Sequence, residues 1–412
     1  MKIRGSLVHS IMAPFVALAS IAYIFRFSGP IGEISLFRVA LGIYLVCALI
    51  KLVRLNNSQT AEEFARLLIA GALFALPALI DIVFLTTDPL LARSVFSFFA
   101  NLLFWAAFAF VVDSRYFELY LKWYCWISVL ESVIALYAYA TMKFPLDFLI
   151  KAYGSDYVKS LSIFNINDGF VRLNGTFFDP NFYGIYLVSV ILAALWLYLY
   201  KGRSLFYLLL MLVSFAQLIM TTSRTSLLAL GGVVIAYVIY RGVATWVVLA
   251  GSAVGAIAGA VLVMASPAMY ERLFNSESVN DRLAFFERGI NAFLESPIFG
   301  GGSESLVDPA SGISTAHSVY LSVLGRNGLF GAASFLFAVA IIMAPIISGR
   351  CASIARRHFA MQVFLFVAIA FVSYDTLYYF EPLYLLFGLM FVSMKIEPEM
   401  RGVQTAFSNG DS

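Results

Sequence analysis

The sequence predicts an all-α polytopic membrane protein with about twelve transmembrane helices. Of its 412 residues, 61% are hydrophobic and 12% are charged, whereas a soluble domain carries roughly 25% charged residues. The mean hydropathy is +0.88. Charge-free apolar stretches such as 180–200 and 204–223 recur along the chain, and each approaches the roughly 20 residues that a bilayer core requires. This composition excludes a soluble enzyme and a disordered protein, and the net charge of +3 does not indicate a nucleic-acid partner.

Polar and charged residues between the apolar stretches define where each expected span begins and ends. Two spans, the third and the fifth, are each interrupted by one acidic residue, Asp81 and Glu131. We expect residues 1–412 to form a single transmembrane domain, since no internal repeat divides the series. The expected spans are 8–26, 34–50, 67–86, 94–112, 119–142, 183–200, 204–221, 225–240, 244–265, 318–347, 359–376 and 378–394.

Basic residues predict the orientation of these spans. Lys and Arg gather in the short segments between alternate spans, which are 2–4, 51–66, 115–122, 201–203, 350–357 and 395–401. Short cytoplasmic loops carry an excess of Lys and Arg in membrane proteins. We therefore expect both termini in the cytoplasm and the alternate loops on the outer face.

Two loops, 143–182 and 266–317, are much longer than the others, and in this orientation both face outward. Loops of this length are usually functional when they are not disordered, and both contain many apolar and aromatic residues. The second loop includes a predicted helix over 282–295, preceded by the plausible N-cap pair Asn280 and Asp281 and followed by Ser296-Pro297. We expect folded caps over the helical bundle.

Arginines in the outer segments are candidates for binding an anion. Arg224 lies in the polar turn 221–226 between two apolar spans, where the positive-inside rule disfavours a basic residue; the alternative is a side chain that reaches to the lipid headgroups. Arg282 falls in the first turn of the predicted loop helix, where the helix dipole disfavours a cation unless an anion binds there. Arg172 and Arg288 are either further anion contacts or solvated surface residues.

His317 is the only histidine expected on the outer face, at the start of the tenth span. An unperturbed imidazole titrates near pH 6.5, which suits a general base; the alternative is a structural histidine. Acidic residues at or near membrane depth are functional hypotheses by default, or they pair with an arginine such as Arg38 to hold the bundle together. These acidic residues are Asp81, Glu131, Asp375 and Glu381.

No motif for a metal or a nucleotide is present in the sequence. The three cysteines are far apart, so neither a disulfide framework nor a zinc site is indicated. The sequence also has no DxD, HExxH, P-loop or nucleophile-elbow pattern. We therefore expect no metal and no other cofactor.

Three segments resemble the O-antigen ligase and O-antigen or exopolysaccharide polymerase superfamily of bacterial inner-membrane glycosyltransferases. The first, residues 172–184, is similar to the family's RxxGTFxxPN stretch, and the second, 222–225, to its SR(G/T) turn. The third has the family's order of an arginine, PxxGxG, H(N/S)xYL and a glycine, here at Arg282, 297–302, 317–321 and Gly328. Ser318 stands where many members have Asn. The resemblance covers about 170–335.

The resemblance implies a fold related to other lipid-donor glycosyltransferases, an inner-membrane location and a metal-independent periplasmic active site. It implies a polyprenyl-pyrophosphate-linked oligosaccharide as donor and a glycan as acceptor. Cleavage of a sugar–pyrophosphate bond develops negative charge that arginines can stabilise. By resemblance, the catalytic residues are Arg224, Arg282 and His317. The expected substrate contacts are Arg172, Arg288, Asn181 and Tyr320. Membrane lipids and a chain-length regulator or other polysaccharide assembly proteins are the further expected partners, and no nucleic acid.

Three activities remain open at this point. A polymerase joins repeat units on the lipid carrier, and the His-Ser-x-Tyr-Leu form together with the aromatic first loop favours it. A ligase transfers the finished glycan to lipid A core. A lipid-linked oligosaccharide flippase or other transporter is the third, but transporters tend to show related halves and midplane charges, whereas the polar residues here gather in the outer loops.

Overall fold

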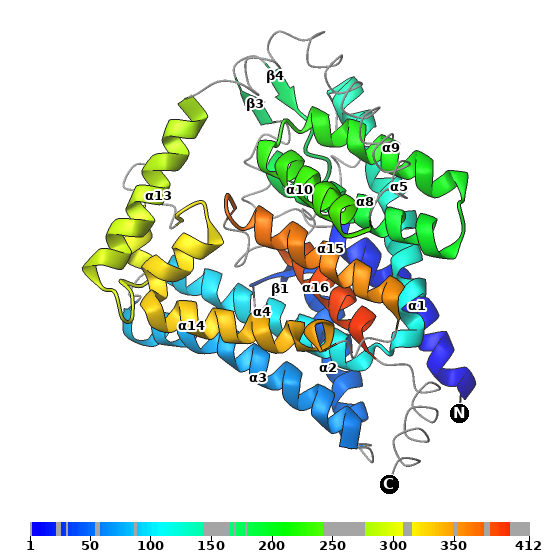
Figure 1. Cartoon of the computed structure of the whole chain (residues 1–412), viewed down its shortest axis with the longest axis horizontal. Coiled ribbons are helices and arrows are strands. Elements are labelled where there is room, and N and C mark those ends of the chain that lie inside the picture. The colour runs from blue at the N-terminus through cyan, green and yellow to red at the C-terminus, as the bar shows by residue number, and fades with distance from the viewer. Residues whose placement is uncertain are drawn as a thin grey trace.

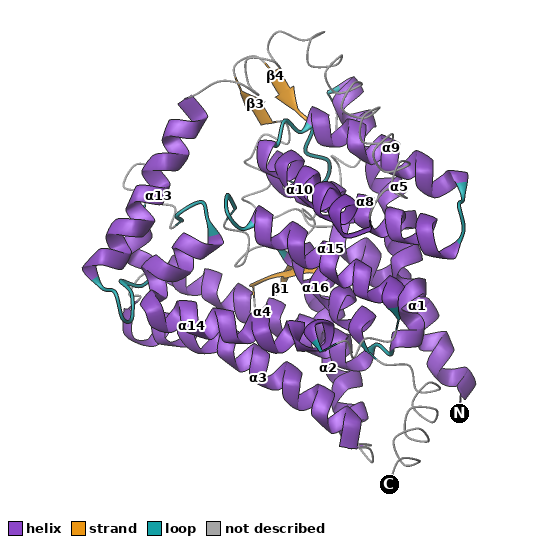
Figure 2. Ribbon diagram, in the orientation of Figure 1, coloured by secondary structure: helices purple, strands orange, loops and turns teal. Residues whose placement is uncertain are grey.

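The computed structural model describes residues 2–21, 26–29, 32–53, 58–85, 89–142, 165–167, 170–177, 179–241, 277–307, 315–348, 353–374 and 380–395. This part of the chain is mostly helical, and strands occur there only as two short hairpins (Figures 1 and 2). The expected span over 244–265 and most of the first long loop lie outside the described residues.

The described helices overlap the expected spans in order, except for α13, which lies in the second long loop. They are α1 (Lys2–Ile21), α2 (Leu36–Val53), α3 (Ser58–Ile80), α4 (Pro89–Val111), α5 (Phe117–Thr141), α8 (Pro180–Lys201), α9 (Leu205–Met220), α10 (Arg224–Arg241), α13 (Glu277–Glu295), α14 (Val319–Ile347), α15 (Ile354–Ala370) and α16 (Glu381–Met394). A π-helical turn, η1 (Asp81–Leu85), continues α3, and a 3-10 turn, η4 (Ser303–Leu306), lies between α13 and α14.

The two hairpins are additions to the predicted all-α fold. Strand β1 (Arg26–Gly29) pairs with β2 (Gly32–Ser35), and β3 (Asn165–Asn167) pairs with β4 (Phe170–Arg172), both antiparallel. In the second hairpin Asn165 lies opposite Arg172.

Five helical segments of the described residues are long and apolar enough to cross a membrane. They are Leu36–Val53, Ala61–Val83, Ser114–Thr141, Pro180–Lys201 and Val319–Ile347. Large apolar side chains on the outside of these segments remain exposed, such as Leu49 at 62% and Leu336 at 65%. A polar solvent would not favour such a surface, and a bilayer would. The fold is thus that of an α-helical membrane protein.

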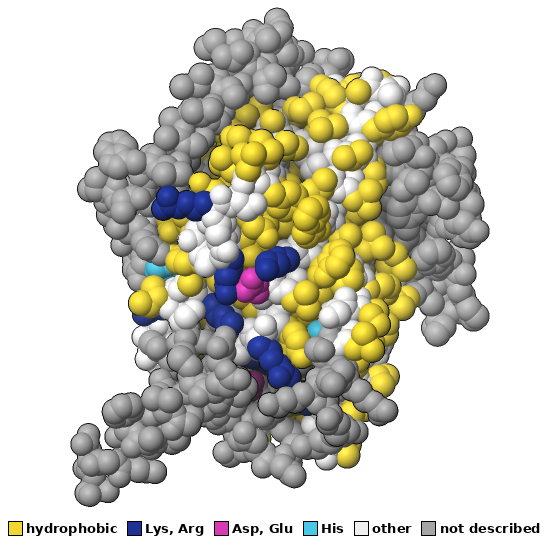
Figure 3. Space-filling model, turned by 90° about the vertical axis from the view of Figure 1, so that its right-hand side faces the viewer, with side chains coloured by type: hydrophobic (Ala, Val, Ile, Leu, Met, Phe, Trp, Pro, Cys, Tyr) yellow, Lys and Arg dark blue, Asp and Glu magenta, His cyan; other side chains and the backbone are white. Residues whose placement is uncertain are grey.

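Basic residues meet at one end of the bundle. Lys51 Nζ lies 3.0 Å from a carboxylate oxygen of Asp113, and the buried Lys395 donates to main-chain carbonyls at the end of α4, at 3.1 and 3.4 Å. The carboxylate of Glu118 binds Lys201 at 2.7 Å. Figure 3 views the molecule from the right-hand side of Figure 1 and shows several basic side chains around a small acidic spot on a largely hydrophobic surface.

Other contacts join the opposite ends of the same helices. The Thr176 hydroxyl donates to the carbonyl of Ile21 at the end of α1, at 2.5 Å. Ser35, directly before α2, donates to Glu381 at the start of α16, at 3.0 Å. Because the helices run between these two ends, the segments 172–181, 221–226 and 315–319 gather at the end away from the basic cluster.

Helix α14 reverses direction at Gly328. That residue has φ 60° and ψ −157°, which interrupts the helical backbone. The rings of Tyr320 and Phe335, on either side of the interruption, pack edge to face with centroids 6.2 Å apart. A straight helix would separate these residues by about 22 Å, so the short first arm folds back along the longer second arm.

Several predicted boundaries agree with the structure and others move. Helix α14 begins directly after Ser318, and α13 ends at Glu295, as expected. Helix α13 begins earlier than predicted, at Glu277 rather than at Arg282. Helix α15 ends at Ala370, whereas the sequence predicted a span reaching 376.

Candidate active site

A strand, a tight turn and a helix start position Arg172 and Asn181. Gly175 has φ +56°, and a Cβ added there would lie 2.1 Å from Glu131 Oε1, so only glycine fits this turn. The Glu131 carboxylate accepts from the Thr176 main-chain N–H at 2.7 Å, and its second oxygen lies 2.9 Å from the Thr176 hydroxyl oxygen. Asp179 caps α8 by accepting from the Asn181 N–H at 2.6 Å. Glu131 therefore fixes this turn to α5.

The polar turn between α9 and α10 is compact and strained. Thr222 has φ 51°, which is unusual for a β-branched residue. Its buried hydroxyl has no hydrogen-bond partner among the described residues, while the Ser223 and Ser226 hydroxyls bond to each other at 3.0 Å. Arg224 is the first residue of α10 and is half-buried. Strain of this kind is typical of functional sites.

Tyr374 joins three segments that the sequence motifs treated separately. Its hydroxyl donates to Asn181 Oδ1 at 3.2 Å and is hydrogen-bonded to the Ser223 hydroxyl. Its main-chain carbonyl accepts from the Val319 N–H, at the start of α14, at 3.0 Å. The side chain is 5% exposed, and burial raises the pKa of its phenol, against the opposing effect of Ser223. The tyrosine therefore remains a neutral hydrogen-bonding group.

Arg172 belongs to the same network. Its Nε donates to the Thr221 carbonyl at 2.9 Å, and its terminal nitrogen donates to Asn181 Oδ1 at 3.2 Å. The side chain is buried. Arg172 is therefore not a solvated surface residue, and it orders both the turn and Asn181.

Helix α13 brings Arg282 to this network. Its Nη1 donates to the Thr225 hydroxyl, one residue after Arg224, at 3.1 Å. Because α13 begins at Glu277, Arg282 lies in the second turn of the helix. The prediction that Arg282 occupies the first turn is wrong. The helix dipole is weaker at the second turn, so it no longer indicates a bound anion there. What links Arg282 to the site is its contact with Thr225.

His317 lies just before α14 and contacts α13 at Phe285, one turn after Arg282. Its φ is 50°, and its main-chain N–H donates to the Thr315 hydroxyl at 2.9 Å. The imidazole packs edge to face on Phe285 with centroids 4.3 Å apart, and the guanidinium of Arg288 lies 5.0 Å from the same ring. Phe285 of α13 thus contacts both His317 and Arg288.

Three buried acidic residues hold loop segments by hydrogen bonds: Asp81 at the start of η1, Glu131 within α5 and Glu381 at the start of α16. Asp81 accepts from the Ser303 N–H at 2.8 Å and from its hydroxyl at 2.5 Å. Glu131 and Glu381 accept from Thr176 and Ser35, as described above. These contacts assign the three carboxylates a structural role at the loops, and Asp375 lies outside the described residues.

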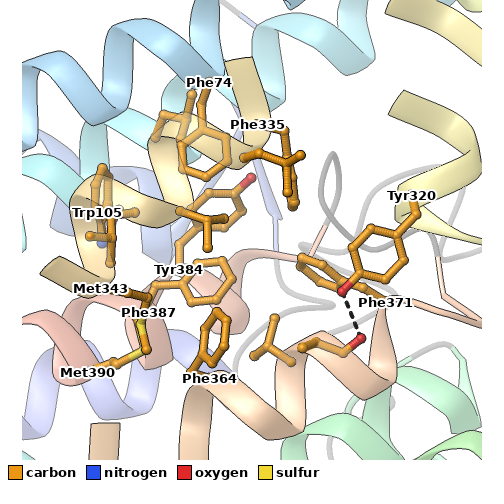
Figure 4. A pocket seen from close by; sticks show the side chains of 16 residues that line it. Phe74, Trp105, Tyr320, Phe335, Met343, Phe364, Phe371, Tyr384, Phe387 and Met390 are labelled. Atoms are coloured by element: carbon orange, nitrogen blue, oxygen red, sulfur yellow. Dashed lines mark hydrogen bonds between the residues drawn. The ribbon is translucent and has the colours of Figure 1, made fainter. Parts of the chain in front are cut away.

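Tyr320 points away from the polar network. Its hydroxyl donates to the Ala368 carbonyl at 2.9 Å, and its ring lines an apolar cavity between α14, α15 and α16 (Figure 4). The structure therefore joins Arg172, Asn181 and Arg282 to the turn that holds Arg224. His317 and Arg288 both contact Phe285, one turn after Arg282 on α13, and Tyr320 lies apart from these residues. Among the described residues, no group of three or more His, Cys, Asp or Glu side chains gathers.

Sequence reasoning missed Tyr374, Thr225 and Phe285. The one local signal for Tyr374 is that residues 373–375 are polar although they lie at the end of a predicted span. Because the predicted span includes these residues, the prediction assigns them to a membrane helix and not to a site. Thr225 is the last residue of the SR(G/T) turn, but nothing in that motif indicates its contact with Arg282, and Phe285 lies between motif residues with no distinguishing feature.

These features define an α-helical membrane protein with an arginine-bearing polar site at one end of its bundle. Residues 209–336 match the family model described as O-antigen ligase. The predicted resemblance to the O-antigen ligase and polymerase superfamily is thereby confirmed over this segment, which contains Arg224, Arg282 and His317. Arg172, Asn181 and Tyr374 lie outside it. A comparison with curated proteins gives no match.

Proposed function

We propose that the protein is a polysaccharide polymerase of the bacterial inner membrane, which joins oligosaccharide repeat units carried on polyprenyl pyrophosphate at the periplasmic face. The observation that carries the proposal is the convergence of Arg282 from α13 on the turn that holds Arg224, within a segment of the O-antigen ligase family. Enzymes of this family are glycosyltransferase-like, and the lipid-linked donor is our inference for this chain.

In the proposed step, an acceptor hydroxyl oxygen forms a bond to the anomeric carbon of the donor sugar. The bond from that carbon to the pyrophosphate oxygen breaks, and polyprenyl pyrophosphate leaves. Arg224 and Arg282 stabilise the negative charge on the leaving pyrophosphate, because guanidinium groups match phosphate geometry. His317 accepts the proton of the acceptor hydroxyl and later releases it to solvent.

Differences in burial and hydrogen bonding support separate roles for the three arginines. Arg172 is buried and bonded to a main-chain carbonyl and to Asn181, which suits a residue that holds the site in place. Arg224 and Arg282 are half-buried, so each residue, unlike Arg172, retains exposed surface that a ligand can reach.

A ligase is the second candidate, favoured by the description of the matched family. The same residues would act, and the acceptor would be lipid A core in place of a second lipid-linked repeat unit. Purified protein given only lipid-linked repeat units separates the two, because a polymerase extends them and a ligase requires the core acceptor.

The test measures product formation by purified full-length protein with arginine variants. Arg224→Ala and Arg282→Ala should each lower turnover by about 100-fold, the usual effect of losing one group that stabilises transition-state charge. The Lys variants should recover part of this, since an ammonium keeps the charge and loses the fork. Arg115→Ala, at the basic end of the bundle, is the control and should retain activity.

His317→Ala should lower turnover by roughly 10²–10⁴-fold, the range for a general base, while the donor still binds. Activity should persist in EDTA, since arginines supply the positive charge. Wild-type turnover by both arginine variants at normal protein levels would refute the assignment, and so would a loss in EDTA that Mg²⁺ restores.

A further inference from the structure

The cavity beside the polar site owes its shape to the reversal of α14. Residues on both arms, Tyr320 on the first and Phe335 and Met343 on the second, line it together with side chains of α3, α4, α15 and α16. The reversal requires glycine, because a Cβ at Gly328 would lie 2.5 Å from the main-chain carbonyl of Ile298. The Leu329 N–H also donates to the Pro297 carbonyl at 2.8 Å, and this hydrogen bond fixes the position of the reversal at Gly328.

The cavity is apolar along its whole length. Figure 4 shows aromatic and methionine side chains pointing into it, with Tyr320 and Phe371 at one end and Met343 and Met390 at the other. The hydroxyl of Tyr320 is bonded to the Ala368 carbonyl at 2.9 Å. The volume is about 170 Å³, slightly more than the roughly 150 Å³ of a dry protein cavity that binds benzene. It suits a short branched hydrocarbon segment and no polar group.

One wall of the cavity belongs to the membrane-facing surface. Leu336 lines the cavity and is 65% exposed, and its neighbour Phe337 is 64% exposed. The opposite wall is the core of the bundle, where Trp105 and Tyr384 are 2% and 1% exposed. A hydrocarbon chain can therefore enter sideways from the bilayer without crossing water.

The other boundary of the cavity is the polar site. Phe371, at the Tyr320 end, accepts through its carbonyl from the Ser318 hydroxyl at 3.2 Å and from the Val319 N–H at 3.0 Å. Val319 also binds the Tyr374 carbonyl, and Tyr374 bonds to the turn that carries Arg224. A short chain of hydrogen bonds thus connects the wall of the apolar cavity to the turn that carries Arg224.

We infer that this cavity binds the head-proximal isoprene units of the lipid carrier, while the pyrophosphate lies at Arg224 and Arg282. The inference rests on the proposed function for the identity of the carrier. An anionic head next to the arginines and an apolar chain beside them are the two halves of one amphiphile, so charge and polarity both match. Methionine and aromatic linings adapt to an irregular, methyl-branched chain.

The binding test uses an isoprenyl pyrophosphate with a photoreactive group on its first isoprene units, added to the full-length protein in nanodiscs. We expect crosslinks at α14, α15 and α16 residues of the cavity, reduced by unlabelled isoprenyl pyrophosphate. Val339→Phe fills the cavity and should reduce the crosslink at least tenfold. Val213→Phe is the matched control, because Val213 lies on α9, is 39% exposed and does not line the cavity.

A phospholipid with the same photoreactive group on its acyl chain identifies the competing occupant. If it labels the cavity and isoprenyl pyrophosphate does not compete, the cavity holds bulk membrane lipid and the inference is overturned. Unchanged labelling in a folded Val339→Phe variant would also overturn it.

Activity measurements distinguish this inference from the proposed function. Val339→Phe should raise KM for the lipid-linked donor about tenfold, equivalent to losing the burial of about two methylene groups, with little change in kcat. Crosslinking without any glycan synthesis would leave the binding site supported and remove the proposed reaction. Glycan synthesis with no crosslink in the cavity would do the reverse.

Discussion

Removal of one hydroxyl group, by Tyr374→Phe, tests whether the polar network positions the arginines. The substitution keeps the buried ring and deletes the hydrogen bonds to Asn181 and Ser223. Each neutral hydrogen bond contributes about 0.5–1.5 kcal/mol net. Asn181 Oδ1 still accepts from Arg172, and Ser223 still bonds to Ser226, so neither partner is left fully unsatisfied. We therefore expect a loss of about 1–2 kcal/mol in the free energy of unfolding.

The Tyr374→Phe variant should lose more turnover than its reduced amount of folded protein explains. If the hydroxyl restrains Asn181 and the Arg224 turn relative to each other, its removal loosens the charge-stabilising groups, and kcat should fall about tenfold, which corresponds to roughly 1.4 kcal/mol. The assay is turnover per folded protein with the lipid-linked donor, beside thermal unfolding in the same detergent.

Tyr186→Phe is the matched control. Tyr186 is buried in α8, and its hydroxyl has no hydrogen-bond partner among the described residues. Deleting that hydroxyl should leave stability equal or slightly higher, because a buried unpaired hydroxyl carries a desolvation cost. If the two variants have the same stability and the same kcat, Tyr374 does not hold the site together and the reasoning fails.

Two further predictions concern the topology and the reversal of α14. In a cysteine-free background, Glu304→Cys should react with an impermeant thiol reagent in intact spheroplasts and Arg203→Cys only after lysis, since both positions are exposed and lie at opposite ends of the bundle; the opposite pattern would invert the orientation. Gly328→Ala should lower stability by about 2 kcal/mol or more, because φ +60° disfavours a side chain and its Cβ would meet a main-chain carbonyl. Gly231→Ala, on α10 with nothing within 4 Å of the added carbon, should instead raise stability by up to about 1 kcal/mol. Equal melting temperatures for the two glycine variants would contradict this account.

Features set by local chemistry were predictable from the sequence. The turn around Arg224 follows from polar residues between two apolar runs, the start of α14 from the capping Ser318, and the end of α13 from Ser296 and Pro297. Each depends on residues adjacent in the chain. The family motifs likewise predict one site for Arg172, Arg224 and Arg282. Arg172 and Arg282 both contact the turn that holds Arg224, and the catalytic role of these residues stays a prediction.

Features set by distant partners were not predictable. Asp81 binds Ser303 across more than two hundred residues, so its role at a loop has no local signature, and the same holds for Tyr374 and Asn181. Gly328 belonged to a motif, but its positive φ depends on the approach of the 297–302 segment. The start of α13 was predicted too late because the Asn280-Asp281 pair resembles an N-cap, and the helix continues through it.

The reversal at Gly328 also determines how much membrane thickness α14 covers. A straight helix of its 29 residues would be about 44 Å long, well beyond a hydrocarbon core of about 30 Å. The second arm, Leu329 to Ile347, measures about 28 Å by the same rise per residue and matches that core alone. The first arm runs back beside the second, so Ser318 and His317 lie closer to the middle of the bilayer than the reversal at Gly328 does. The end of α14 that carries His317 is therefore recessed within the protein, and in the proposed reaction a glycan would reach inward past α13 to meet it.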